Sequence, residues 1–282
     1  MNVQHFYDQD TSTLTYIVFD SHSKDAVIID PVLDYDPASG KIEGRNLNKL
    51  INFISEHQLN PHYCLETHAH ADHLSSSQYL KKNYPQLKVA ISEKITQVQK
   101  TFSDILDLEF NFSFDGSQFD KLIKGTEIFH AGTIKIEAIA TPGHTPACLS
   151  FYIANMLFCG DALFIEDSGT GRCDFPGGSA EDLYHSIHDK LYKLPDETIC
   201  FVGHDYQPNG RELRFETTIG VSKNLNSQLK EVTSKESYLS FREARDKTLS
   251  APRLLFPSIQ VNIQAGTLPK FIKLPIFNKI KN

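Results

Sequence analysis

The segment Thr67-His68-Ala69-His70-Ala71-Asp72-His73 (THAHADH) places three imidazoles and a carboxylate directly after a predicted strand over residues 62–67. In extended backbone, side chains two residues apart point the same way, so His68 and His70 can converge on one point. A helix expected to start near Asp72 would place Asp72 and His73 in its first turn, facing a neighbouring point. Imidazole is the commonest transition-metal ligand, and a solvated His-rich loop is a weaker explanation of so compact a pattern. The segment therefore predicts a metal site.

Three further candidate ligands each follow a predicted strand. His144 lies in TPGHT, where Gly143 would let the backbone turn sharply; Asp161 follows Cys159-Gly160; and His204 lies in VGHDY. Each one alone is explained equally well as a loop residue that caps nearby backbone. Four such positions in one chain favour a site, because open α/β proteins place their sites at strand ends. Six other histidines lack this context and are interpreted as surface or packing residues: His22, His57, His62, His130, His185 and His188.

Hydrophobic periodicity predicts hairpins first and then alternating strands and helices, which indicates a mixed α/β layered fold rather than a purely parallel sheet. A polar loop is expected over 34–44 and a surface excursion over 93–125, and Ser179 is the expected N-cap of a helix. The expected strands are 13–20, 24–31, 62–67, 88–92, 134–140, 149–153, 156–159 and 198–202, and the expected helices are 47–57, 74–82, 180–194, 215–233 and 238–248.

The composition excludes several classes of protein. The chain has 282 residues, is 40% hydrophobic and 22% charged, and carries a formal net charge of −7, which disfavours nucleic acids and anionic membranes as partners. No apolar run approaches the roughly 20 residues that span a bilayer, and the N-terminus does not resemble a signal peptide. Five cysteines without a CxxC pair argue against a disulfide framework and a zinc ribbon. We therefore expect a cytoplasmic protein with reduced thiols and no membrane or nucleic-acid partner.

The order THAHADH, TPGHT, the Asp of CGD and GHDY resembles the metallo-β-lactamase superfamily over roughly residues 10–206. The resemblance implies an αββα sandwich, in which two mixed β-sheets are flanked by helices and a metal lies at one edge. It also implies a catalytic domain over residues 1–206. Residues 207–282 would form a helical and extended C-terminal extension packed on the same domain.

Gly169-Thr170-Gly171-Arg172-Cys173-Asp174-Phe175 and the LYxSIxxKLxxLP helix after it look like the glutathione persulfide dioxygenases. The tail, with REARD, APRL and PSIQVN over residues 242–262, resembles the bacterial β-lactamase-hydrolase-like subgroup. Glyoxalase II enzymes share the GxGR part but usually continue with Phe-Glu-Gly. Two positions depart from the dioxygenases. Thr170 stands where many have Cys, and Asn226-Ser227-Gln228 stands where mitochondrial members have Arg after Asn-Pro. Contacts to glutathione carboxylates would then come from other residues, such as Arg211 or Arg214.

The resemblance implies one Fe(II) per chain, held by His68, His144 and Asp161, with three octahedral positions open to a persulfide and O₂. The surrounding residues His70, Asp72, His73 and His204 would orient these ligands. Related hydrolases instead hold two zinc ions, one on His68, His70 and His144 and the other on Asp72, His73 and His204, with Asp161 bridging them. All seven residues are present, so the ligand set alone leaves both possibilities open.

The implied reaction is the oxidation of glutathione persulfide by O₂ to sulfite and glutathione. Arg172 would pair with a substrate carboxylate or with Asp174, where it would stiffen the loop. Tyr206, beside His204, would donate to sulfur or oxygen or be tethered to backbone. A binuclear glutathione thioesterase of the glyoxalase II kind and a metal-free binding module remain alternatives, and a homodimer is compatible with either. The candidate catalytic residues are Arg172, Asp174, His204 and Tyr206.

Overall fold

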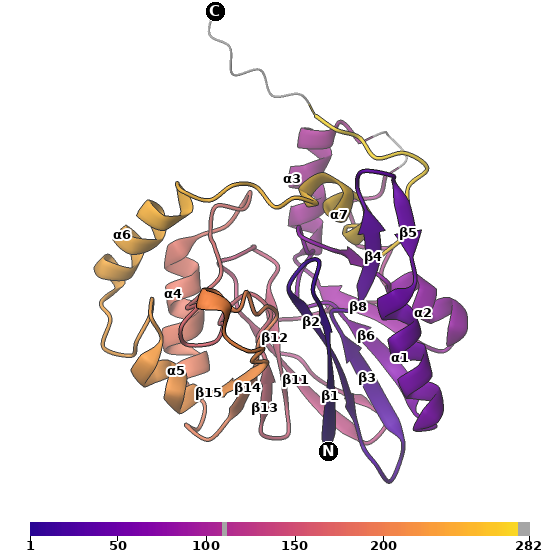
Figure 1. The fold of residues 1–282 in the computed structure, drawn as a ribbon, viewed down its shortest axis with the longest axis horizontal. Helices are drawn as coiled ribbons and strands as arrows, with labels where there is room; N and C mark the ends of the chain where they lie inside the picture. The colour runs from indigo at the N-terminus through magenta and orange to yellow at the C-terminus, as the bar shows by residue number, and fades with distance from the viewer. Residues whose placement is uncertain (109–111, 276–282) are drawn as a thin grey trace, which may run out of the picture.

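The computed structural model describes residues 1–108 and 112–275 as two six-stranded mixed sheets packed face to face, with helices on both outer faces. Figure 1 shows this layered arrangement, which confirms the expected αββα sandwich. Within the described residues no helix is both long and apolar enough to cross a membrane.

The first sheet has the strand order β1-β2-β3-β6-β8-β9, antiparallel through β3 and parallel from β3 onward. Apolar side chains on the inner faces of β2 and β3 pack against the second sheet, and those on the outer faces pack against helices. The strands are β1 (Asn2–Asp8), β2 (Thr13–Phe19), β3 (Asp25–Ile29), β6 (Asn60–Leu65), β8 (Lys88–Ser92) and β9 (Lys121–Ile123), and the covering helices are α1 (Arg45–Glu56), α2 (Ser77–Asn83), α3 (Ile95–Leu106) and α7 (Leu255–Asn262).

The second sheet has the order β10-β11-β12-β13-β14-β15 and is antiparallel except for the pair β13 and β14. Its outer face is covered largely by α4, whose N-cap Ser179 accepts a hydrogen bond from the Asp182 amide as expected. The elements are β10 (Ile128–Ala131), β11 (Ile134–Ala140), β12 (Leu149–Ile153), β13 (Met156–Phe158), β14 (Ile199–Phe201), β15 (Glu216–Thr218), α4 (Ala180–Asp189), α5 (Ile219–Leu225) and α6 (Lys235–Asp246), with short 3₁₀ turns at Leu191–Lys193 and Pro208–Gly210.

Two predictions near the metal motif are wrong because the chain forms a small third sheet there. The expected polar loop over 34–44 is a hairpin of β4 (Val32–Asp36) and β5 (Lys41–Glu43). The expected helix at Leu74 begins only at Ser77, because β7 (Leu74–Ser75) pairs with β4. Tertiary pairing therefore overrides the local helical pattern.

Two other regions also differ from the prediction. The expected excursion over 93–125 contains α3, which buries Ile95, Val98 and Phe102, although 109–111 lie outside the described residues. The expected helix over 215–233 is instead the edge strand β15 followed by the shorter α5, because β15 completes the second sheet beside β14. The strands at 88–92, 134–140 and 149–153 match the prediction.

The predicted extension runs over both halves of the molecule. Helix α6 packs on α4, and α7 packs beside β7. Residues 247–254 cross between these two helices, as the connection in Figure 1 shows. The proposed domain boundary at residue 206 stays a prediction, and residues 276–282 lie outside the described part of the chain.

Candidate metal centre

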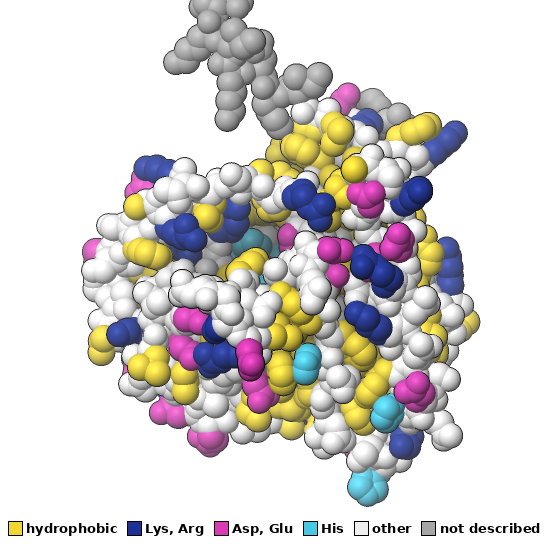
Figure 2. All heavy atoms as spheres, in the orientation of Figure 1, with side chains coloured by type: hydrophobic (Ala, Val, Ile, Leu, Met, Phe, Trp, Pro, Cys, Tyr) yellow, Lys and Arg dark blue, Asp and Glu magenta, His cyan; other side chains and the backbone are white. Residues whose placement is uncertain are grey.

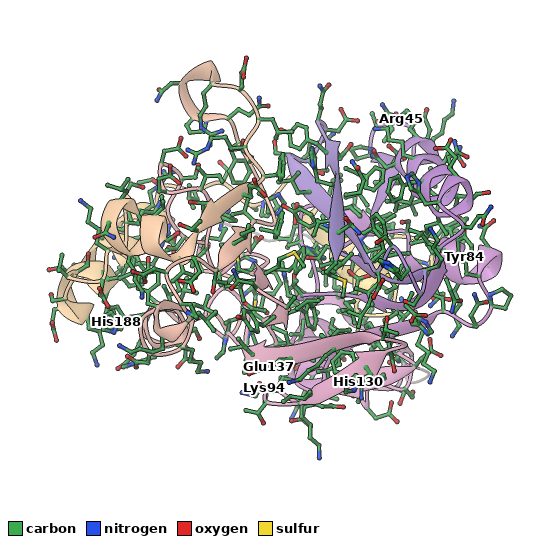
Figure 3. All side chains as sticks on the ribbon, turned by 90° about the horizontal axis from the view of Figure 1, so that it is seen from below. Arg45, Tyr84, Lys94, His130, Glu137 and His188 are labelled. Carbon is green, nitrogen blue, oxygen red and sulfur yellow. The ribbon has the colours of Figure 1, made fainter. Side chains whose placement is uncertain are left out.

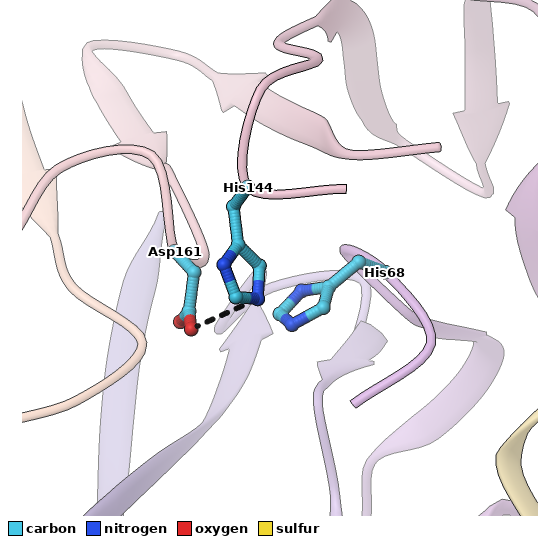
Figure 4. A group of neighbouring side chains, drawn as sticks. All are labelled: His68, His144 and Asp161. Atoms are coloured by element: carbon cyan, nitrogen blue, oxygen red, sulfur yellow. Dashed lines mark ion pairs between the residues drawn. The ribbon is translucent and has the colours of Figure 1, made fainter. Parts of the chain in front are cut away.

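Three separate loops bring His68, His144 and Asp161 together at one edge of the sandwich. They follow β6, β11 and β13, and each of the three side chains offers a ligand atom within 4.8 Å of the others. All three residues are buried, and His144 Nε2 lies 3.5 Å from Asp161 Oδ2. Figure 4 shows the two imidazoles and the carboxylate turned toward a common point.

Hydrogen bonds on the outer nitrogens fix the orientation of both imidazoles. The Thr67 hydroxyl donates to Asp30, and its oxygen lies 3.0 Å from His68 Nδ1, where it accepts that N–H. His144 Nδ1 donates to the Arg172 carbonyl at 2.7 Å. Each ring then carries its proton on Nδ1 and presents a bare Nε2 lone pair to the centre, as metal-binding histidines do.

A glycine sets the turn that presents His144. Gly143 has φ = +145°, and a Cβ at this position would lie 2.3 Å from Leu183 Cβ. Only glycine therefore fits between this loop and α4, which agrees with the sharp turn expected from the sequence.

A second group lies beside the first. His70, Asp72 and His73 each offer a ligand atom within the same mutual distance, and His204 Nε2 lies 3.4 Å from both Asp72 and Asp161. The structure therefore gathers all seven candidate ligands. Asp72 and His73 lie in the loop before β7, so the expectation that they begin a helix is wrong.

Several inward-facing polar atoms are buried without a hydrogen-bond partner. Burial and the charge of nearby imidazoles hold the pKa of His68 well below its ordinary value and lower the pKa of His73 to about 4. Both rings are therefore neutral at pH 7 and available as ligands. Native proteins rarely bury so many unpaired polar atoms together, so this donor set fits a metal ion. The atoms include His68 Nε2, His70 Nδ1, His73 Nε2 and Asp161 Oδ1.

Two acidic residues, Asp30 and Glu66, lie beside the Nε2 atom of His70. This atom lies 3.0 Å from Asp30 and 3.7 Å from Glu66, and all three residues are buried. Burial alone would lower the pKa of His70, but the Asp30 carboxylate outweighs it and raises that pKa. Burial raises the pKa of Glu66, whose Oε1 accepts a hydrogen bond from Ser75.

Asn262 in α7 ties the histidine loop to the C-terminal extension. Its Nδ2 donates to the carbonyls of His70 and His73, both at 2.8 Å, and its Oδ1 accepts the Ser75 amide at 2.9 Å. Sequence reasoning noted PSIQVN only as a subgroup resemblance and missed this contact. No clear signal for it was present in the sequence, because Ser258 and Gln260 are further polar residues of the same short helix.

Two cavities open onto the centre. The larger, about 450 Å³, reaches His144 and Asp161 and is walled partly by residues 249–255. The smaller, about 340 Å³, shares Asp161, Arg172, Tyr206 and Leu249 with it. Figure 2 shows this face hollowed, with histidine and acidic side chains in the hollow and basic ones on its rim.

The other predicted site residues surround these cavities. Arg172 donates to both Asp174 oxygens at 2.6 Å and to the Ser250 carbonyl at 2.8 Å, so of its two expected partners the structure shows Asp174. The Tyr206 ring stacks on His204, with centroids 5.5 Å apart. Among the described residues the Tyr206 hydroxyl has no hydrogen-bond partner, so it is not tethered to backbone there.

Arg211 and Arg214, suggested for the glutathione carboxylates, are engaged within the protein. Arg211 pairs with Asp167 and Asp205, and Arg214 pairs with Glu166. Histidines outside the motifs lie away from the centre, as Figure 3 shows for His130 and His188 at the periphery. Neither His5 nor any of the six histidines interpreted above as surface or packing residues belongs to a metal-ligand group among the described residues.

Comparison with known sequences gives the same family along most of the chain. The model of the metallo-beta-lactamase superfamily matches residues 9–204. Glyoxylase B2 of Dictyostelium discoideum is 45% identical, with 97% of this chain and 96% of that protein covered. A beta-lactamase hydrolase-like protein of Agrobacterium fabrum is 39% identical over 98% of this chain, which spans 64% of that longer protein. The human mitochondrial persulfide dioxygenase ETHE1 is 32% identical over 72% of this chain and 68% of its own.

Comparison of structures agrees. The crystal structure of ETHE1 from Myxococcus xanthus superposes with a TM-score of 0.76 at 28% identity, covering 95% of this chain and 100% of that one. The family match over residues 9–204 includes all seven gathered ligands and ends at the last of them, His204. The chain therefore belongs to the metallo-β-lactamase superfamily.

Proposed function

We propose that the protein is a mononuclear iron persulfide dioxygenase that oxidises glutathione persulfide with O₂ to sulfite and glutathione. The observation that carries the proposal is the group His68, His144 and Asp161, two members of which, His144 and Asp161, line the larger cavity. Two imidazoles and one carboxylate form the ligand face of non-haem Fe(II) oxygenases. Similarity to the human and Myxococcus ETHE1 proteins supports this choice.

The three ligands suit one ferrous ion. His68 and His144 would each give an Nε2 lone pair, and the Asp161 carboxylate would offset part of the metal charge. When bound, Fe(II) would supply redox chemistry at positions open to both the persulfide sulfur and O₂. The metal count is one per chain in this proposal.

The remaining residues would position the substrate and its surroundings. Arg172 holds Asp174 by its side chain and His144 by its carbonyl, so it acts as a positioning residue. The Tyr206 phenol is protonated at neutral pH and faces both cavities, where it can donate to the sulfur. Apolar groups of Phe175 and Pro252 limit water near the reacting sulfur.

A binuclear hydrolase of glutathione thioesters is the second candidate. The group His70, Asp72 and His73, with His204 close by, could hold another metal, and two metals would activate a water for attack on a carbonyl. The name of the Dictyostelium relative, Glyoxylase B2, also favours this candidate.

Metal analysis combined with two assays separates these candidates. Protein purified without added zinc is analysed for metals, then tested for O₂ uptake with glutathione persulfide and for S-lactoylglutathione hydrolysis. We expect one iron per chain and persulfide-dependent O₂ uptake. An active enzyme containing only zinc, which hydrolyses the thioester without O₂, would establish the hydrolase instead.

A further inference from the structure

The two cavities beside the metal centre differ in charge. The charged residues lining the smaller cavity are Asp161 and three arginines, Arg172, Arg242 and Arg245. The larger cavity adds three further acids, Asp10, Asp72 and Asp174, and has Arg172 and Arg253 as its basic residues. The smaller cavity therefore favours a carboxylate, and the larger one accommodates an ammonium group.

Two of the three arginines in the smaller cavity are already occupied. The Arg172 guanidinium donates hydrogen bonds to both oxygens of Asp174 and to the Ser250 carbonyl. Arg242 is buried and donates to Asp246, Thr170 and Gln228. Neither fork is free to receive both oxygens of an incoming carboxylate.

Arg245 differs from both neighbours. It lies near the end of α6, is exposed, and its guanidinium forms no hydrogen bond or ion pair with the described residues. A planar guanidinium matches the two oxygens of a carboxylate, and such bidentate pairs are among the strongest hydrogen bonds in proteins. Arg245 is thus the one arginine of this cavity with its full set of donors available, among the residues that the structure describes.

We propose that Arg245 binds the glycyl carboxylate of the substrate's glutathione moiety in the smaller cavity, while the γ-glutamyl end enters the larger one. This inference rests on the proposed function and names its substrate subsite. Glutathione has its sulfur in the middle, a lone carboxylate at one end, and an ammonium with a carboxylate at the other. Two cavities of unlike charge that meet at Asp161 fit those two ends on either side of the metal centre.

The assignment also accounts for a departure noted in the sequence. Gln228 stands where mitochondrial relatives were expected to carry an arginine, and its Oε1 accepts from Thr170 and Arg242. Thr170, at the other departing position, also bonds to Tyr238 in α6. These residues fix α6 at the cavity wall and so place Arg245 beside it.

Steady-state O₂ uptake by the iron-loaded full chain tests the subsite. Arg245→Ala should raise KM for glutathione persulfide about tenfold or more with little change in kcat, because a charge-assisted pair is lost. Arg245→Lys should recover part of this loss. The persulfide of glutathione amide, which lacks the glycyl charge, should already show the raised KM with the unaltered enzyme and should not be weakened further by Arg245→Ala.

A matched control removes the same charge nearby. Lys247 pairs with Glu243 and lies outside the smaller cavity, so Lys247→Ala should leave KM unchanged. An unchanged KM in Arg245→Ala, or an equal loss with the amide, would overturn the subsite while leaving the dioxygenase intact. If the enzyme oxidised no persulfide but still bound glutathione through Arg245 in calorimetry, the subsite would stand and the proposed function would fail.

Discussion

The two ends of β6 gather the same kinds of side chain but use them differently. At its amino end His62 Nε2 lies 2.6 Å from Asp25, whose other oxygen accepts the Thr133 amide at 2.8 Å. No buried side-chain atom of these three residues lacks a partner. Beyond its carboxyl end, His68 and the neighbouring Asp161, which follows β13, each keep a buried atom without a hydrogen-bond partner.

This difference distinguishes a hydrogen-bond network that stabilises the fold from a binding site. A histidine–acid network whose hydrogen bonds are all made contributes to stability, whereas buried polar atoms without a hydrogen-bond partner cost free energy unless a ligand binds them. Residue type and burial alone would not distinguish the two ends of β6. They are distinguished by whether each buried polar atom has a hydrogen-bond partner.

The largest expected effect comes from removing the acid at the carboxyl end. Asp161→Ala deletes one of three proposed ligands, so iron content should fall below about a tenth of normal and activity by about a thousandfold or more. Asp25→Asn, the matched change at the amino end, should keep iron and rate. Metal analysis and O₂ uptake measure both variants. An Asp161→Ala protein with full iron and full rate would contradict the ligand assignment.

An intermediate effect is expected from Asn262→Ala, which removes the support of the histidine loop. Three hydrogen bonds to buried backbone groups are lost, so the free energy of unfolding should fall by about 2–3 kcal/mol. Iron affinity should weaken by about tenfold, since groups that orient metal ligands act at this scale. Chelator competition and urea unfolding measure the two quantities.

Gln264→Ala is the control for that change. Among the described residues, the Gln264 side chain donates one hydrogen bond, to the Gln260 carbonyl in the preceding helix α7. Gln264→Ala should leave the iron affinity unchanged. It should change the free energy of unfolding by no more than about 0.5 kcal/mol. Equal losses in both variants would show that Asn262 acts on the helix rather than on the histidine loop.

Much of the fold and the site could be predicted from local sequence, because strong patterns agree with tertiary structure there. The strand at 134–140 alternates clearly, and the motif histidines follow strands. The structure brings these histidines together. Prediction failed where distant pairing decides the structure, as at Leu74, which joins β4, and at Glu216, which joins β14.

The supporting contacts of the site were also hidden from the sequence. Asn262 lies almost two hundred residues along the chain from His70, and the freedom of Arg245 is evident only once its neighbours are seen to be paired. His62 was interpreted as a surface or packing residue, and its ion pair with Asp25 could not be identified from the sequence. No periodicity encodes such long-range polar pairs.

The smallest expected effect concerns that amino-end pair and its response to pH. Burial raises the pKa of Asp25, but hydrogen bonds from His62 and Thr133 outweigh it and hold this pKa below the ordinary value. A depressed pKa stabilises the fold above the unfolded value of about 4, and this contribution is lost as pH falls toward the folded value. The amide of Asp25→Asn cannot titrate. The difference in unfolding free energy between the unaltered protein and this variant should therefore shrink by about 1 kcal/mol from pH 6 to pH 3.

Urea unfolding at pH 6, 4 and 3 measures this difference. A difference that stays constant, or widens as pH falls, would mean that the Asp25 carboxylate gains nothing from its partners. We expect this difference in unfolding free energy to shrink as the pH falls, while Asp25→Asn keeps its iron at pH 6. Since the pair lies at the far end of β6 from the metal ligands, that result would separate the stability of the strand from the chemistry at its other end.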